Sequence, residues 1–309
     1  MRTMPSFFDE YKGKLLLAPM AGVTDKAFRT ICLRHGAALT YTEMVSAKGL
    51  EYDNKNTWDL LEPADEEEKI AVQLFGHEPN VLAAQAHAVQ QHLGSKLAFI
   101  DVNMGCPVKK VVSKDEGSAL MKTPDEAAEI ISSICKNVDV AVTAKFRSGW
   151  DSQSVNAVDF ALRLQEAGAA AVAIHGRTSK QMYSGKADWS IIAQVKAACE
   201  IPVIGSGDIY SFDDAQKMME QTGADAVMAA RGARGNPWIF ENKIPSKEER
   251  LACMREHLHL YVQFFGSEHL TPLRSQFAAY AHGISGAAQF RRALSQCTSY
   301  EDFEGLLND

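Results

Sequence analysis

One of the six cysteines, Cys106, lies in a segment better suited to chemistry than to packing. It belongs to Asn103-Met104-Gly105-Cys106-Pro107, where glycine and proline shape a loop. The other five cysteines fall within helix-like segments and suit small core positions. We therefore predict a chemical role for the Cys106 thiol alone.

Two further side chains stand at or near the end of an apolar run. Lys145 follows the apolar residues 140–144, and a lysine buried there would need an anionic partner, so we favour function over packing. His175 ends the run 171–175 and suits contact with a ligand, although a hydrogen-bonded structural histidine is the alternative. A buried lysine also suits Schiff-base chemistry, so an aldolase stays open as a third possibility.

Two glycine-containing segments suit a phosphate group. Gly205-Ser206-Gly207-Asp208 and Ala230-Arg231-Gly232 each follow a short apolar run, where backbone N–H groups of a loop or helix start bind anions. The Arg231 guanidinium adds a bidentate donor. No HExxH motif or His/Cys/carboxylate cluster has metal-ligand spacing, so we predict an organic, phosphate-bearing cofactor and no metal.

The elements that must position these residues are eight short apolar runs, each followed by a stretch with helical periodicity. The runs cover residues 15–18, 39–44, 70–75, 98–103, 140–146, 171–175, 202–206 and 226–231. Eight such units predict a (β/α)8 TIM barrel, whose working residues lie at the carboxyl ends of the strands. A doubly wound open sheet is the alternative, but no GxGxxG follows the first run.

The last quarter of the chain changes character. Helix-like segments at 246–265, 272–284 and 287–294 follow without strands between them. We predict a barrel domain over residues 1–240 and a small C-terminal helical domain over 241–309.

Composition bounds the class of protein. The chain has 309 residues, 46% hydrophobic and 23% charged, which excludes fibrous and disordered classes. Its net charge of -7 argues against coating nucleic acid by bulk charge but allows a local basic patch. Scattered cysteines predict reduced thiols in the cytoplasm, and no apolar run is long enough for a membrane span.

Six segments form a pattern when they are read together: residues 18–25, Val72-Gln73-Leu74, 103–107, 145–150, His175-Gly176-Arg177-Thr178 and 185–189, spread in this order along the predicted barrel. The pattern resembles the bacterial-type, FMN-dependent tRNA-dihydrouridine synthase family. The chain departs from the family pattern with Ser206 and Ala230 in the phosphate segments, and with Arg274-Ser275-Gln276 where the tail usually carries an Arg-Lys-His cluster.

The resemblance implies FMN across the barrel mouth and NADPH as its reductant. FMN would contact Pro19, Met20, Ala21, Gln73, Lys145, His175, Ser206, Gly207, Asp208, Ala230 and Arg231. Hydride would reach C6 of a tRNA uracil, while Cys106 donates a proton to C5. A free thiol, with a pKa of roughly 8.5, is mostly protonated near neutral pH, as this role requires.

The implied partner is tRNA, whose target base must leave its stack to reach the cofactor. Asn103 would orient the base, and Lys109, Lys110, Lys114, Arg147, Arg177 and Arg274 are the candidate substrate contacts. Two other functions stay open: a flavin reductase of a free small molecule, and a tRNA-binding or folding factor with weak or lost redox chemistry.

Overall fold

Eight parallel strands form the centre of the molecule, in a computed structural model that describes residues 7–282 and 286–308. The strands are β1 (Leu15–Leu17), β2 (Tyr41–Ser46), β3 (Ile70–Phe75), β4 (Leu97–Met104), β5 (Val142–Arg147), β6 (Ala171–His175), β7 (Val203–Ser206) and β8 (Ala226–Ala229). Neighbours pair in the order β1-β8-β7-β6-β5-β4-β3-β2. Hydrogen bonds from Leu17 N to Leu39 O and from Ala38 N to Leu15 O join the two ends of this order. The predicted barrel is confirmed.

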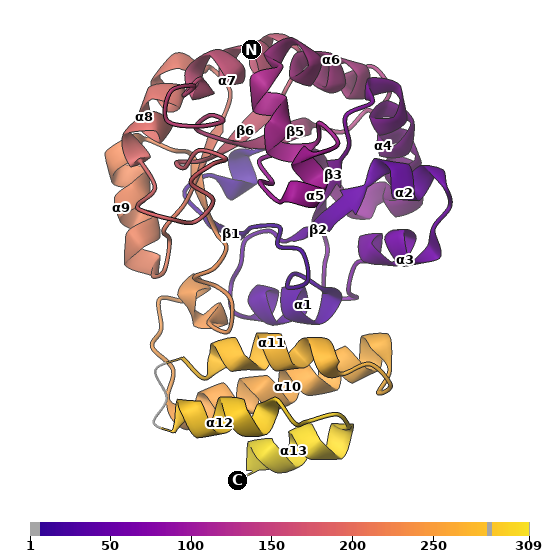
Figure 1. Cartoon of the computed structure of the whole chain (residues 1–309), viewed down its shortest axis with the longest axis vertical. Helices are drawn as coiled ribbons and strands as arrows, with labels where there is room; N and C mark the ends of the chain where they lie inside the picture. The colour runs from indigo at the N-terminus through magenta and orange to yellow at the C-terminus, as the bar shows by residue number, and fades with distance from the viewer. Residues whose placement is uncertain (1–6, 283–285, 309) are drawn as a thin grey trace.

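Helices surround the strands (Figure 1). They are α1 (Lys26–Arg34), α2 (Ala47–Glu51), α3 (Lys55–Trp58), α4 (Pro79–Leu93), α5 (Lys109–Val112), α6 (Pro124–Cys135), α7 (Ala157–Glu166), α8 (Trp189–Ala198) and α9 (Phe212–Thr222). Short 3-10 helices are η1 (Asp9–Tyr11), η2 (Asp59–Leu61), η3 (Gly94–Lys96), η4 (Gly117–Lys122) and η5 (Pro237–Phe240). Side-chain caps fix several starts, such as the Asp25 carboxylate at α1 and the Ser211–Asp214 capping box at α9.

Alternation along the strands separates a dry interior from a polar mouth. Inward positions in the lower barrel carry small or aromatic residues, such as Ala71, Phe99 and Ala171, which pack with Phe8 and Tyr11 at the amino-terminal end. On β3, β4 and β5 the next inward positions toward the carboxyl ends are polar, namely Gln73, Asp101 and Thr143, so the apolar packing stops there below the mouth. Outward residues of the same strands pack against the helices in a separate cluster.

Several strand boundaries differ from the sequence prediction by one or two residues, and the differences at β2 and β8 have a visible cause. β2 begins at Tyr41 and not at residue 39, because Leu39 bonds to β1 and the register with β3 shifts between Tyr41 and Met44. β8 ends at Ala229, because the chain turns directly afterwards, with Ala233 N donating to Ala230 O. Ala230 and Arg231 therefore lie in a turn and not in a strand.

The C-terminal region is helical, as predicted, and packs against α1. Its helices are α10 (Lys247–Phe265), α11 (Thr271–Tyr280), α12 (Ala287–Leu294) and α13 (Tyr300–Asn308). Their apolar core includes Ala27 and Ile31 of α1, so the two parts share one packed interface. The end of the helix predicted over 272–284 falls partly on residues 283–285, outside the described residues. The domain boundary at 240/241 stays a prediction.

Polar contacts also join the two parts. Gln276 Nε2 on α11 donates to the Asp25 carboxylate at 2.6 Å, and Arg34 on α1 pairs with both Glu66 and Glu256. Figure 1 places the C-terminal helices on the α1 side of the barrel, with α11 and α10 nearest to α1 and α12 and α13 beyond them.

Candidate active site

A cavity of about 410 Å³ opens at the carboxyl ends of the strands. Most of the predicted site residues line it: Pro19, Met20, Ala21, Gln73, Asn103, Cys106, Lys145, Arg147, His175, Ser206, Gly207, Asp208, Ala230 and Arg231. They come from the ends of all strands except β2, whose contribution to the lining is Met44. The structure thus gathers residues spread over more than 200 positions of the sequence around one space.

A directed chain of hydrogen bonds underlies the cavity. Asp101 Oδ2 accepts from Gln73 Nε2 at 2.7 Å, and Gln73 Oε1 accepts from Asn103 Nδ2 at 2.7 Å. Asn103 Oδ1 then accepts from the Cys106 amide at 2.9 Å and the Gly105 amide at 3.2 Å. Strand register produces this chain, because Gln73 on β3 lies beside Asp101 on β4, and Asn103 is the next inward residue. This series of hydrogen bonds fixes the orientation of the Gln73 and Asn103 side-chain amides.

Lys145 carries an ammonium group into this cavity without a hydrogen bond or ion pair to any of the described residues. Burial, with the nearby Arg147 charge, lowers the pKa of Lys145 to about 8, although the Asp101 charge opposes the shift. Burial likewise raises the pKa of Asp101 to about 6 against hydrogen bonds from Gln73 and Thr143. Near pH 7 a half-buried cation therefore faces the cavity and is available to an anionic group of a ligand.

The Cys106 thiol lines the cavity on a loop held at several points. Its carbonyl accepts from Ser118 N at 3.0 Å and Ser118 Oγ at 2.9 Å, while its amide is held by Asn103. Gly117 allows this approach, since it has φ +60° and a Cβ there would lie 2.8 Å from the Cys106 carbonyl oxygen. Burial raises the pKa of the Cys106 thiol, so the group is protonated at neutral pH.

His175 lies at the cavity as a neutral imidazole. Burial and the surrounding cations Lys145, Arg147 and Arg177 hold its pKa well below the ordinary value. Its Nε2 accepts from Arg177 Nη1 at 3.3 Å, which leaves the proton on Nδ1. His175 can therefore donate a neutral hydrogen bond from that nitrogen.

Two arginines expected to contact substrate are largely engaged within the protein. Arg177 is 2% exposed and binds the Ser184 and Gly185 carbonyls and Asp208 Oδ2, so the expected surface contact with RNA phosphate is wrong for this residue. Arg147 lines the cavity but donates to the Gly105, Thr178 and Met182 carbonyls. Both guanidinium groups hold the mouth loops in place.

The two glycine-containing segments after β7 and β8 line the same cavity, and their phosphate role stays a prediction. The backbone amides of Gly207, Asp208, Arg231 and Gly232 donate to no acceptor among the described residues. Gly207 has φ +115°, and a Cβ there would lie 2.8 Å from the His175 ring, so only glycine fits. Arg231 is partly exposed beside these amides and lies 3.3 Å from Asp208 Oδ1. Free amides with a nearby guanidinium make an anion site.

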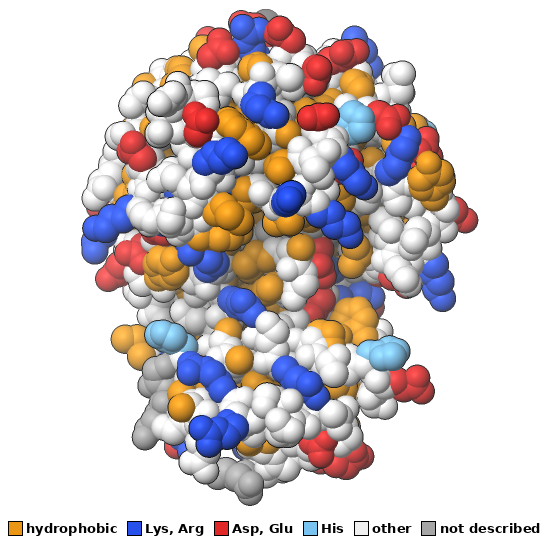
Figure 2. Space-filling view, in the orientation of Figure 1, with side chains coloured by type: hydrophobic (Ala, Val, Ile, Leu, Met, Phe, Trp, Pro, Cys, Tyr) orange, Lys and Arg blue, Asp and Glu red, His pale blue; other side chains and the backbone are white. Residues whose placement is uncertain are grey.

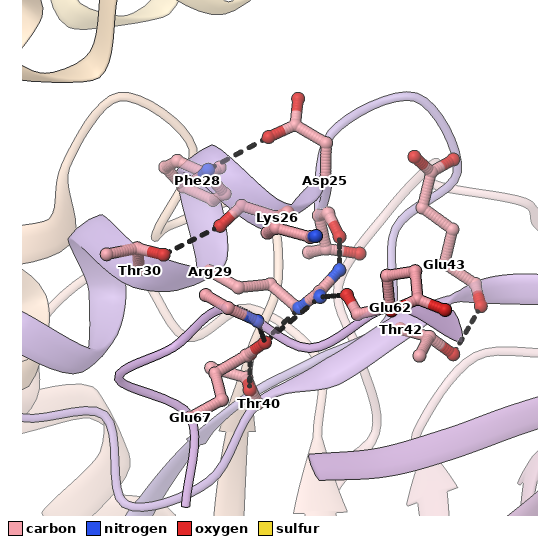
Figure 3. Close-up of polar contacts among 12 residues, drawn as sticks. Asp25, Lys26, Phe28, Arg29, Thr30, Thr40, Thr42, Glu43, Glu62 and Glu67 are labelled. Carbon is pink, nitrogen blue, oxygen red and sulfur yellow. Dashed lines mark hydrogen bonds and ion pairs between the residues drawn. The ribbon is translucent and has the colours of Figure 1, made fainter. Parts of the chain in front are cut away.

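The loop after β1 is fixed from behind by a buried ion pair (Figure 3). Arg29 on α1 binds Glu67 through two nitrogens, at 2.8 and 3.0 Å, and donates to the Thr24 carbonyl at 3.1 Å. The Thr24 hydroxyl accepts from Met20 N at 3.0 Å. Met20 is thereby held where it lines the cavity.

Comparison with known proteins identifies the family. The sequence model described as dihydrouridine synthase matches residues 16–308. The chain belongs to the dihydrouridine synthase family. It is 47% identical over 310 residues to tRNA-dihydrouridine synthase B of Xanthomonas campestris pv. campestris, covering 96% of this chain and 92% of the relative. It is 38% identical over 309 residues to tRNA-dihydrouridine synthase B of Pseudomonas aeruginosa, covering 94% and 92%.

A further relative supports this assignment, whereas a structural match at low sequence identity adds no argument to it. Probable tRNA-dihydrouridine synthase 1 of Synechocystis sp. is 38% identical over 307 residues, covering 96% of this chain and 85% of the relative. A nitroalkane oxidase structure from Streptomyces ansochromogenes aligns with 98% of this chain and 97% of its own at 16% identity and a TM-score of 0.46.

Several functional candidates of this dihydrouridine synthase family member were missed by the sequence analysis. Asp101 lies inside an apolar run, and the available signal was its position two residues before Asn103, on the same inward face. Tyr183 and Tyr210 line the cavity, are 53% and 51% exposed, and lie 4.7 and 5.7 Å from the Arg231 guanidinium. Their loops have no periodicity from which to place them.

The remaining predicted contacts lie outside the cavity. Lys109 and Lys110 are exposed on α5, and Lys114 follows that helix. Arg274 on α11 donates from Nε to the Cys297 carbonyl at 2.7 Å. Figure 2 shows Lys and Arg side chains on both the barrel and the C-terminal helices, around a hollow between them.

The described part of the chain lacks two further features. Within residues 7–282 and 286–308, no helix has the length and apolar character needed to cross a bilayer. In the same ranges, His, Cys, Asp and Glu side chains form no group of three or more that could hold a metal ion.

Proposed function

We propose that this protein reduces uridines of tRNA to 5,6-dihydrouridine, with FMN as its cofactor and NADPH as the reductant. The observation that carries the proposal is a half-buried, protonated Cys106 thiol in the same cavity as the Lys145 ammonium group and the free backbone amides after β7 and β8. Membership of the dihydrouridine synthase family supports the product, and the names of the relatives support tRNA as the substrate.

The residues present fit FMN. The free amides of Gly207, Asp208, Arg231 and Gly232, with the Arg231 side chain, suit its phosphate, and Lys145 suits the polar edge of the ring system. Pro19, Met20 and Ala21 give the cavity an apolar wall, and Gln73, His175 and Ser206 add polar contacts. When bound, the flavin supplies the hydride that adds to C6 of uracil, after its own reduction by NADPH.

Each polar side chain then has a distinct part. The Cys106 thiol donates its proton to C5, so that one hydride and one proton saturate the C5=C6 bond, and solvent returns a proton to the thiolate. Asn103 uses one N–H toward Gln73, which leaves the other for the uracil edge. Lys145 stabilises negative charge on the neighbouring ring. The neutral His175 donates from Nδ1 without adding a further positive charge.

The substrate base has to leave its stack to reach the cavity. Unstacking costs a few kcal/mol, and less in a single-stranded loop of folded tRNA. The exposed Lys109, Lys110 and Lys114, with Arg274 on the helical region, supply candidate phosphate contacts. We place this reaction in the cytoplasm, where tRNA is processed.

The test is dihydrouridine formation by purified protein, measured by mass spectrometry of nucleosides from tRNA that lacks this modification. With NADPH, we expect dihydrouridine from the wild type and a loss of about 10²- to 10⁴-fold in Cys106→Ala. Full activity of Cys106→Ala would refute the proton-donor role. Reduction of free uridine at the same rate would favour a small-molecule reductase, whereas tRNA binding without reduction would favour a binding or folding factor.

A further inference from the structure

Asp101 lies beneath the site, at the start of the hydrogen-bond chain that ends at Cys106. Its carboxylate is 0% exposed and does not line the cavity. Oδ2 accepts from Gln73 Nε2 at 2.7 Å, and Oδ1 accepts from Thr143 Oγ1 at 2.6 Å. The strand register places Gln73, Asp101 and Thr143 side by side on β3, β4 and β5. Asp101 therefore touches no ligand and acts only through its neighbours.

An ionised carboxylate accepts hydrogen bonds and donates none, which gives the chain a direction. Because Asp101 only accepts, Gln73 must turn its NH₂ group downward and its carbonyl toward Asn103. Asn103 must then turn its NH₂ group toward Gln73 and its carbonyl toward the Gly105 and Cys106 amides. If the Gln73 amide turned over, two NH₂ groups would face each other, and Asn103 would have to release the loop.

We propose that Asp101 is a positioning residue for proton transfer: it sets the direction of the Gln73–Asn103 amide chain and so holds the Cys106 loop. The link to proton transfer rests on the proposed function. The link to the loop rests on the hydrogen bonds alone.

Asp101 could instead act as the counter-charge of Lys145, and this second role makes a different prediction. The two groups attract each other electrostatically, but no hydrogen bond joins them. Asp101→Asn separates the two roles, because it removes the charge while its oxygen can still accept from Gln73. The introduced NH₂ group can donate to the Thr143 hydroxyl, which accepts as readily as it donates. Asp101→Leu removes charge and acceptor together.

The experiment compares Asp101→Asn, Asp101→Leu and a matched control, Thr143→Val, in the flavin-loaded protein at pH 8. Thr143→Val removes the other hydrogen bond to Asp101 and leaves the Gln73 side intact. The first readout is hydrogen exchange of the Gly105 and Cys106 amides. We expect exchange about fivefold faster or more in Asp101→Leu, the effect of losing one hydrogen bond, and little change in the other two proteins.

The second readout is steady-state reduction of tRNA per bound flavin. We expect kcat to fall about a hundredfold in Asp101→Leu, less than about tenfold in Asp101→Asn and less than about threefold in Thr143→Val, with KM for tRNA unchanged. If Asp101→Leu does not fold, Gln73→Met removes the next hydrogen bond of the series, the one between Gln73 and Asn103. We expect the same faster exchange of the Gly105 and Cys106 amides in that variant.

Two results would overturn the proposal. Equal losses of kcat in Asp101→Asn and Asp101→Leu would show that the effect comes from the charge of Asp101. Unchanged hydrogen exchange of the Gly105 and Cys106 amides in Asp101→Leu would show that the loop is held without these hydrogen bonds. A wild-type protein that forms no dihydrouridine would instead refute the proposed function, while the exchange comparison would still decide whether Asp101 positions the loop.

Discussion

At the scale of single residues, the site combines a protonated thiol with a cation whose charge is lost close to the physiological range. Burial raises the pKa of Cys106 and lowers the pKa of Lys145 to about 8. The thiol therefore stays protonated over a range in which Lys145 loses its charge. Binding of an anionic cofactor, unlike proton donation, should depend on pH just above neutrality.

The Lys145 shift predicts how flavin affinity changes with pH. The polar edge of the flavin ring accepts a stronger hydrogen bond from the charged lysine, so the Kd for FMN should be flat below pH 8 and rise above it, by at most about tenfold per pH unit. In Lys145→Arg the charge persists and the rise should disappear. Quenching of FMN fluorescence between pH 7 and 9.5 measures this. A Kd for the wild type that is flat across this range would contradict the assignment.

At the scale of elements, loops at the mouth are held by buried groups behind them. The Arg29–Glu67 pair connects α1 to the segment before β3, and through Thr24 it holds the Met20 loop (Figure 3). Both side chains are at most 2% exposed, so removal of one leaves the other charge buried without its partner. The pair fixes one loop geometry at the cost of burying two charges.

This pair predicts a non-additive effect on stability. Glu67→Leu should lower the free energy of unfolding by about 3–5 kcal/mol, because it strands the Arg29 charge. The double variant Arg29→Met/Glu67→Leu should lose less than the single variant, since no charge remains unpaired. Urea unfolding of the three proteins measures both values. A double variant less stable than Glu67→Leu would show that the pair is itself strongly favourable.

The elements also show how far the sequence predicts the site. Alternation and strand ends suffice to place Lys145, His175 and Cys106 at one mouth, because parallel strands all end on the same side. Asp101 escapes this logic, since it lies within an apolar run and acquires its role from neighbours on β3 and β5. Arg177 is also polar and near a strand end, but its hydrogen bonds to Asp208 and two carbonyls keep its side chain buried, which the sequence does not reveal. Helix α13 is not among the predicted helices. Its start is marked by capping hydrogen bonds between Ser299 and Asp302, which a search for apolar periodicity does not detect.

At the scale of the whole molecule, the barrel and the C-terminal helices carry Lys and Arg side chains on a common face, which we propose as the face for tRNA. The helical region packs on α1, and Lys and Arg side chains lie on both parts (Figure 2). The overall charge is -7, so attraction to RNA has to come from this local distribution. The exposed lysines of α5 belong to the same mouth as the cavity.

The α5 lysines predict a salt-dependent contribution to tRNA binding. Lys109→Ala/Lys110→Ala should raise KM for tRNA severalfold and reduce the slope of log KM against log salt by about 0.7–0.9 per lost phosphate contact. Lys12→Ala/Lys14→Ala is the matched control, because it removes the same charge beside the start of β1, at the opposite end of the barrel. Equal effects of the two pairs would mean that net charge alone matters.

The most direct test of the account is a single turnover without oxygen. Protein whose flavin has been reduced with NADPH is freed of excess nucleotide and mixed with tRNA lacking dihydrouridine, while flavin absorbance and dihydrouridine are followed together. We predict that flavin is reoxidised with formation of an equal amount of dihydrouridine, and that both slow together in Cys106→Ala. Flavin that stays reduced in the presence of this tRNA, or that is reoxidised without dihydrouridine, would contradict it.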